Sequence, residues 1–154
     1  MIHLLVLCTF LFVSGVVEVS DAVSFQDCGS KIGRFTAVTV SGCDTTKAAC
    51  DLVRNTNASL TIDFIPSQDI EKVTAEVYGV IADLPIPFPL SHPDVCADQE
   101  SNIHCPLKKD TPYSYKAILP VKREYPRLTV QVKWQLKNEN KQDIVCVYIP
   151  AKIK

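Results

Sequence analysis

Alternation of apolar and polar residues is the feature that most constrains the fold of this chain. The clearest segment is 128–137, whose apolar positions are Leu128, Val130, Val132, Trp134 and Leu136. Polar residues occupy the positions between them, so one side of a strand would face a core and the other water. Because no segment shows a sustained 3.6-residue period, the pattern predicts an all-β protein.

The same period-two pattern recurs in other parts of the chain. It covers segments 60–64, 73–78 and 113–119, and segments 35–40 and 144–149 are predicted as two further strands. Turn-forming residues separate these segments, and the polar run 138–141 predicts a hairpin loop. Six or seven strands with one amphipathic face each favour two antiparallel sheets packed face to face in one domain.

The run 84–90 places proline at every second position, with only apolar residues beside Pro85, Pro87 and Pro89. Proline lacks a backbone donor and fixes φ, which excludes a helix interior or a central strand. An apolar composition is also unusual for a solvated loop. We therefore expect a stiff segment that joins no hydrogen-bonded ladder and forms a wall against either the core or an apolar ligand.

The first residues have the pattern of a secretory signal. Residues 4–17 are almost wholly apolar, and Ser20 and Ala22 suit a cleavage site, which predicts a signal peptide at 1–22. The apolar run is shorter than the roughly 20 residues that span a bilayer. Cleavage would leave 23–154 as one domain and change the formal net charge from −1 to +1, because Glu18 and Asp21 are lost. A balance so close to neutral argues against nucleic-acid binding.

Cysteine usage indicates an oxidising compartment. Apart from Cys8 in the signal, the cysteines are Cys28, Cys43, Cys50, Cys96, Cys105 and Cys146. An even set in a secreted chain predicts three disulfides. Spacing favours pairing the second with the third and the fourth with the fifth across short polar loops, which leaves the first and last. Other pairings remain open at this point.

Zinc is the alternative use of some of these side chains. The ligand types are present in His92, Cys96, His104 and Cys105. Adjacent His104 and Cys105 would point in different directions, and no Cys-x-x-Cys knuckle is present. We therefore favour a disulfide and expect no metal and no cofactor.

Several short motifs make the chain similar to a known family. They are Asp27-Cys28-Gly29-Ser30, the proline run, Cys105-Pro106, Tyr113-Ser114-Tyr115, Leu119-Pro120-Val121-Lys122, Glu124-Tyr125-Pro126, Lys133-Trp134-Gln135-Leu136 and Ile149-Pro150 after Cys146. In this order they resemble the Niemann-Pick type C intracellular cholesterol transporter 2 family over essentially all of 23–154. The resemblance implies an ML lipid-recognition domain, an immunoglobulin-like β-sandwich of about seven antiparallel strands with an apolar cavity between its sheets. It also implies disulfides between the first and last, second and third, and fourth and fifth cysteines.

The resemblance carries residue roles with it. Phe88, Val121 and Tyr125 match the positions that gate the pocket in the sterol carriers. The positions that match the pocket wall are Leu119, Pro120, Pro126, Val132 and Trp134, together with Val40, Leu52 and Leu60. Ordinary sandwich core is the competing interpretation, most seriously for Trp134. Val147 stands where many sterol-binding members carry a large aromatic residue, so we expect it to reshape the pocket.

The function implied is that of a monomeric carrier in the extracellular space or lysosomal lumen. It would bind cholesterol or a related sterol and transfer it to membranes or to a membrane receptor protein. Transient contact with anionic membranes would use the charged residues 122–124, for which a solvated loop is the alternative. Fatty acids, odorants or pheromones are alternative ligands, as in related arthropod proteins, and an innate-immune adaptor for bacterial lipids is an alternative role.

Two smaller features complete the sequence-based expectations. Asn57-Ala58-Ser59 is the only N-glycosylation sequon, and we expect it in a polar turn before the next strand. The chain after residue 22 has only His92 and His104 as histidines and lacks a Gly-x-Ser-x-Gly elbow. We therefore do not expect an enzyme.

Overall fold

The structure, a computed structural model, describes residues 22–154. The predicted signal peptide lies outside the described residues except for Ala22, and so does Cys8. In the part of the chain that is described, no helix has the length and apolar character needed to cross a membrane.

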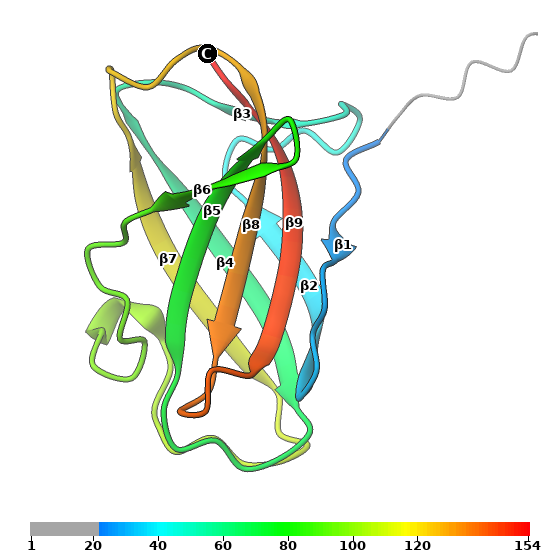
Figure 1. Cartoon of the computed structure of the whole chain (residues 1–154), viewed down its shortest axis with the longest axis vertical. Helices are drawn as coiled ribbons and strands as arrows, with labels where there is room; N and C mark the ends of the chain where they lie inside the picture. The colour runs from blue at the N-terminus through cyan, green and yellow to red at the C-terminus, as the bar shows by residue number, and fades with distance from the viewer. Residues whose placement is uncertain (1–21) are drawn as a thin grey trace, which may run out of the picture.

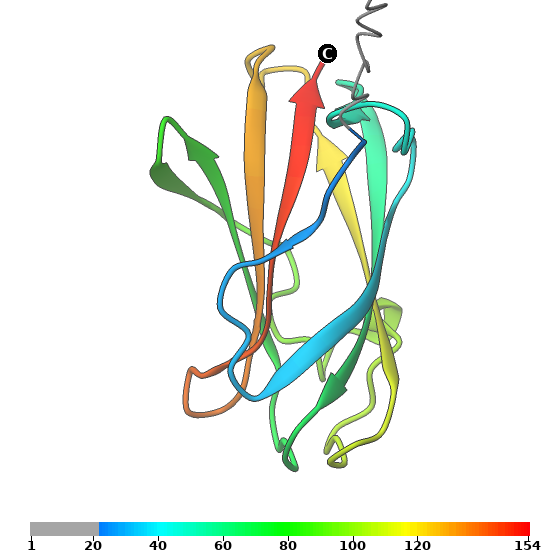
Figure 2. The same ribbon diagram turned by 90° about the vertical axis from the view of Figure 1, so that its right-hand side faces the viewer.

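Two β-sheets packed face to face make up the fold (Figures 1 and 2). The first sheet has the order β1-β9-β8-β5-β6, and a further strand, β3, pairs with β9. Its strands are β1 (Gln26–Asp27), β3 (Cys50–Leu52), β5 (Thr74–Ile81), β6 (Leu84–Phe88), β8 (Thr129–Lys137) and β9 (Asp143–Ile153). The second sheet has the order β2-β4-β7, with β2 (Gly33–Val40), β4 (Thr56–Pro66) and β7 (Tyr113–Val121). One short 3₁₀ helix, η1 (Gln99–Ser101), lies between β6 and β7. The β-sandwich expected from the alternating pattern is thus confirmed.

The apolar faces that alternate along the strands meet between the two sheets. Trp134 of β8 and Phe64 of β4 are among the largest fully buried side chains, from opposite sheets. The ring of Trp134 lies 6.1 Å from that of Tyr115 in β7, centroid to centroid. The side chains that face inward from both sheets form the core, and β9 is buried on both faces, since Ile144 to Val147 are all fully buried.

The proline run departs from its expected role, because residues 84–88 form the edge strand β6. This strand pairs antiparallel with β5 across a two-residue hairpin turn, in which Ala82 and Asp83 have φ values of 48° and 65°. Backbone donors alternate between the two sides of a strand. Pro85 and Pro87 therefore lose donors on the same side, and as an edge strand β6 needs none on its solvent side. The expectation that this run joins no ladder was wrong for that reason.

Two other short strands were not expected from the sequence. β1 pairs antiparallel with β9 at residues 147–148, whereas β3 pairs with β9 in parallel at residues 151–153. The parallel pairing of β3 is an addition to the antiparallel sheets that the sequence predicts. Strands of two or three residues are too short to show a period-two pattern.

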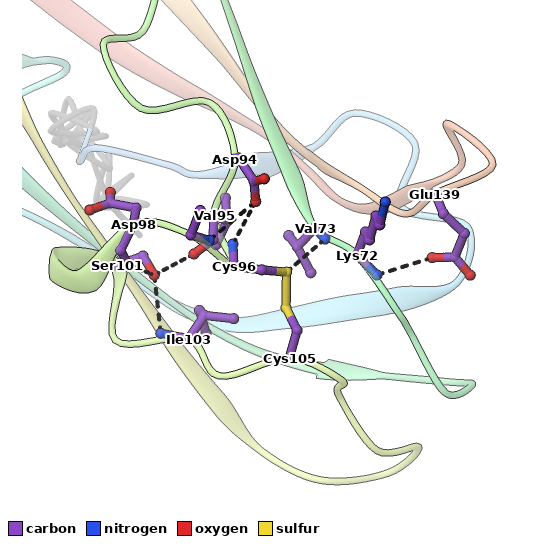
Figure 3. The surroundings of a disulfide bond; sticks show 11 residues. Lys72, Val73, Asp94, Val95, Cys96, Asp98, Ser101, Ile103, Cys105 and Glu139 are labelled. Carbon is purple, nitrogen blue, oxygen red and sulfur yellow. Dashed lines mark hydrogen bonds between the residues drawn. A yellow bond between two sulfur atoms is a disulfide. The ribbon is translucent and has the colours of Figure 1, made fainter.

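Disulfides fasten the loops and the amino-terminal segment to this framework. They join Cys28 to Cys146, Cys43 to Cys50 and Cys96 to Cys105, which is the pairing that the family resemblance implies. Figure 3 shows the third bridge, where the backbone N–H of Val73 donates to the Cys96 sulfur at 3.2 Å. In the same loop the Asp94 carboxylate accepts a bond from the Cys96 N–H. The loop after β6 is thereby held against the start of β5.

Candidate functional site

An apolar cavity of about 330 Å³ lies between the sheets at the end where the chain terminates. It is bounded by the last residues of β5, β7 and β9 and by the first residues of β4 and β8. Figure 2 shows the β5–β6 hairpin leaning away from the second sheet at this end. The volume falls at the lower end of the roughly 300–1,000 Å³ typical of small-molecule sites.

The wall of the cavity carries no charged side chain among the described residues that line it. All eleven residues that the sequence predicts for the gate and wall are among them: Val40, Leu52, Leu60, Phe88, Leu119, Pro120, Val121, Tyr125, Pro126, Val132 and Trp134. They come from six strands and one loop and converge on the same space. A cavity of this kind suits a ligand with a large apolar body and few polar groups.

Phe88 and Tyr125 close one side of the cavity. Phe88 ends the edge strand of the first sheet, and Tyr125 lies in the loop that follows β7 of the second. Their rings meet edge to face, with centroids 5.9 Å apart and an interplanar angle of 73°. Val121, the last residue of β7, is 6% exposed and borders the same space. These three side chains therefore lie together at one side of the cavity, between the two sheets.

The Tyr125 hydroxyl remains neutral at physiological pH. Partial burial raises the pKa of Tyr125 above its ordinary value of 10.0, and the nearby Glu124 carboxylate raises it further. Tyr125 therefore presents an uncharged hydroxyl beside the cavity at neutral pH.

A smaller groove of about 120 Å³ lies on the other side of the same aromatic pair. It shares Phe88 and Tyr125 with the cavity but is also lined by charged or titratable side chains: His92, Asp98, Glu100, Lys116 and Lys122. The aromatic pair thus stands at the boundary between an apolar interior and a polar exterior. Such a boundary fits a ligand with one polar end.

Trp134 fits both interpretations considered for it, namely sandwich core and cavity wall. Its side chain is 1% exposed and packs in the core beside Tyr115, yet it also borders the cavity. The indole Nε1 is buried and has no hydrogen-bond partner. Trp134 is therefore a core residue whose ring forms the inner end of the cavity.

Val147, for which we expect an effect on the shape of the pocket, is a core residue. Its side chain is fully buried next to Trp134, its partner across β8 and β9, and it is not among the residues that line the cavity. The inner limit of the cavity is formed instead by Trp134 and Ile149. The small residue at position 147 is thus enclosed by core packing and does not itself border the cavity.

Other lining residues were missed by the sequence-based reasoning. From β8, β9 and the loop before β8 come Leu128, Val130, Ile149, Ala151 and Ile153, and from β5 and β6 come Val77, Tyr78, Gly79, Ile81, Ile86 and Pro87. Those of β8 and β9 occupy inward positions of the alternating pattern, so extending that pattern to the strand ends would have found them. Those near the hairpin could not be found while the proline run was placed outside a sheet.

Polar features of the predicted site lie at the surface. Lys122, Arg123 and Glu124 are exposed in the loop beside the cavity mouth, and His92 and His104 are exposed as well. Asn57 is exposed within β4, opposite Pro120, and not in a turn as expected. Its strand begins earlier because Thr56 already pairs with Val121.

A family model described as the ML domain matches residues 22–153 of the chain. The chain is 48% identical over 141 residues to the NPC intracellular cholesterol transporter 2 homolog a of Drosophila melanogaster, covering 92% of this chain and 94% of the relative. It is 38% identical over 134 residues to the mouse NPC intracellular cholesterol transporter 2, covering 87% of each protein.

A solved structure agrees with these sequence relationships. The crystal structure of a Niemann-Pick type C2 protein from the Japanese carpenter ant superposes with a TM-score of 0.83 at 40% identity. The match covers 85% of this chain and 99% of the ant chain. The relationship therefore extends over the whole sandwich, including the strands that form the cavity.

Proposed function

This chain belongs to the ML-domain family, and from that premise we propose that it carries a sterol in the cavity between its sheets. The observation that supports this most directly is the uncharged cavity, which all eleven predicted gate and wall residues line. Relatives named as cholesterol transporters match nearly the whole chain. Binding, shielding from water and release would be the activity, and none of these steps requires covalent chemistry.

The cavity can supply the free energy for such binding. Burying roughly 400 Å² of apolar ligand surface, at about 25 cal/mol/Å², contributes about 10 kcal/mol before the cost of association. Phe88 and Trp134 offer flat aromatic surfaces, and the branched residues between them suit a rigid ring system. The polar end of the ligand would lie near Tyr125, beside the charged groove.

Delivery would take place at the open end of the sandwich. Lys122 and Arg123 are exposed beside Tyr125, so these cations would meet anionic lipid headgroups or an acidic receptor surface near the cavity mouth. Transfer would then require only that the Phe88–Tyr125 contact opens towards the acceptor. We propose a monomer that makes such contacts transiently.

We also propose secretion and glycosylation. A signal peptide that is cleaved after Ala22 would direct the chain to the extracellular space or the lysosomal lumen. Three disulfides are consistent with that route. Amino-terminal sequencing of the secreted protein should begin at Val23. A glycan on Asn57 would project from the outer face of the second sheet. Treatment with an amidase that removes N-glycans should lower the mass of the wild type but not that of Asn57→Gln.

The ligand is tested by identifying what the protein carries. Organic extraction of the purified secreted protein, followed by mass spectrometry, should yield a sterol in near-stoichiometric amount. Titration with the fluorescent sterol dehydroergosterol should then show saturable binding that cholesterol competes for. A co-purified fatty acid or bacterial lipid, with no competition by cholesterol, would replace the sterol by one of those ligands. Absence of any bound or competing lipid would contradict the carrier function.

A further inference from the structure

The loop that carries Tyr125 connects the two sheets at the cavity mouth. It runs from β7 to β8 through residues 122–128. One turn within it is closed by the Tyr125 N–H, which donates to the Lys122 carbonyl at 3.3 Å. At its far end the Leu128 carbonyl accepts a bond from Ile153. Pro126 has no backbone donor, so the stretch next to Tyr125 has few bonds of its own.

Arg54 reaches this loop from a distant part of the sequence. Its Nη1 donates to the Arg123 carbonyl at 3.1 Å and to the Tyr125 carbonyl at 3.4 Å, across 69 and 71 residues of chain. One guanidinium nitrogen therefore holds the backbone on both sides of Glu124. The Nε of Arg54 is buried and has no hydrogen-bond partner, whereas the side chain as a whole is only partly buried. A buried donor without a partner carries a cost that the two carbonyl bonds must offset.

Arg54 is itself attached to a rigid part of the fold. Its backbone N–H donates to the Lys154 carbonyl at 3.0 Å, and the next residue, Asn55, donates to the Val121 carbonyl. Asn55 has a φ of 65°, which makes the turn between β3 and β4 tight. β3 in turn pairs with β9 and carries Cys50 of the Cys43–Cys50 disulfide. Arg54 therefore connects a fixed frame to a loop with few bonds of its own.

We propose that Arg54 is a positioning residue that holds Tyr125 against Phe88 and thereby sets the rate at which lipid enters and leaves the cavity. This inference rests on the proposed carrier function. Arg54 is not among the residues that line the cavity, so it acts on the ligand through Tyr125. Loss of its two bonds should free the loop and make opening of the aromatic pair easier. Both the closed and the open mouth lead to the same cavity, so the equilibrium affinity should change less than the rates.

The substitutions Arg54→Met and Arg54→Lys distinguish the contribution of the guanidinium group from that of the apolar part of the side chain. Methionine keeps much of the apolar stem without a donor, whereas lysine keeps a single cationic donor group. Arg34→Met is the matched control, because Arg34 is exposed in β2 and pairs with Ile65 at the other end of the sandwich. The two methionine variants each lose one positive charge, whereas Arg54→Lys keeps it. Comparison of the three with the wild type therefore separates the effect of charge from the effect of position.

Two measurements test the proposal. Hydrogen exchange in the lipid-free protein should be faster for residues 122–127 in Arg54→Met, intermediate in Arg54→Lys and unchanged in Arg34→Met. Dehydroergosterol should bind and dissociate about tenfold faster in Arg54→Met, as expected when hydrogen bonds from a charged donor are lost, with a Kd within about threefold of the wild type. The melting temperature of each variant shows whether the fold is intact.

The outcomes are distinct. Unchanged exchange in residues 122–127, or faster exchange with unchanged sterol rates, would overturn the role of Arg54. A lower melting temperature without a change in either rate would make Arg54 a purely structural residue and would also overturn it. If the wild type binds no lipid, the carrier function fails, and the exchange data alone then decide whether Arg54 anchors the loop.

Discussion

The ring of Phe88 meets the ring of Tyr125 edge to face, with 5.9 Å between centroids. Phe88 comes from the edge of one sheet and Tyr125 from a loop that leaves the other. The contact therefore spans the gap between the sheets and separates the apolar cavity from the charged groove outside. A lipid that passes between the cavity and the groove must break this contact. Substitution of either ring is therefore a direct test of the proposed route.

Phe88→Ala should weaken sterol binding more than it weakens the fold. The substitution removes an aromatic pair worth about 0.5–1.5 kcal/mol and part of the apolar wall, so we expect about a tenfold higher Kd for dehydroergosterol. Phe88 lies at an edge strand and is not fully buried, so the melting temperature should fall only slightly. Fluorescence titration and thermal melting measure the two effects.

Phe35→Ala is the matched control for that substitution. Phe35 is also partly buried and packs against the core, but it does not line the cavity. Its truncation should lower the melting temperature and leave the sterol Kd unchanged. Equal losses of binding and stability in Phe88→Ala would identify Phe88 as plain core.

Val121→Phe should block the cavity with little effect on stability. Val121 is buried at the end of β7 and lines the cavity. A phenyl ring at this position would therefore take up space that a ligand needs. We expect loss of saturable dehydroergosterol binding and a nearly unchanged melting temperature. Ile118→Phe adds bulk to the same strand at a position that is 58% exposed, so it should bind sterol normally. Undiminished binding by Val121→Phe would show that the mouth lies elsewhere.

Most of the main strands could be predicted because apolar and polar residues alternate along them. Leu128 to Leu136 shows this alternation most clearly in the sequence, and the structure buries Val130, Trp134 and Leu136 as the pattern requires, although Gln135 is buried as well. The edge strand β6 could not be predicted in the same way. Its prolines exclude a central strand, but only the pairing with β5 shows that the missing donors fall on one side.

The site was predicted from the family resemblance more than from the pattern itself. Period two marks Val132 and Trp134 as inward, but it does not say whether an inward residue meets a core neighbour or an empty space. Val147 illustrates the difference, because it is as inward as Ile149 yet only Ile149 borders the cavity. The contribution of Arg54 had no local signal, since its partners lie about 70 positions away.

Gly33→Ala should destabilise the fold because the two sheets approach each other closely there. A Cβ at Gly33 would lie 2.7 Å from the Ile144 carbonyl oxygen and 3.1 Å from that of Ile65, and both are backbone atoms. We expect a loss of about 1–3 kcal/mol in the free energy of unfolding, measured by denaturant titration. Gly79→Ala is the comparison, since its nearest contact would be a Val130 methyl group at 3.4 Å. A larger loss in Gly79→Ala than in Gly33→Ala would contradict this account.

Asp27→Asn should make stability less dependent on acid pH. Burial acts to raise the pKa of Asp27, but bonds from the Ser30 side chain and from the Gly29 and Ser30 N–H groups outweigh it and hold the pKa below its ordinary value of 3.8. A carboxyl with a lowered pKa in the folded state stabilises the protein above its unfolded-state pKa, and this contribution disappears as pH falls through the lowered value.

The wild type should therefore lose more of its melting temperature than Asp27→Asn between about pH 5 and pH 2. The difference between the two proteins should be greatest near neutral pH and smallest at the acid end, since both then carry an uncharged side chain at position 27. Parallel curves of melting temperature against pH would mean that the turn at residues 27–30, which contains Cys28, is held without the charge of Asp27. Convergence at low pH would instead show that the Asp27 charge holds this turn, and with it the segment that Cys28 ties to Cys146 in the first sheet.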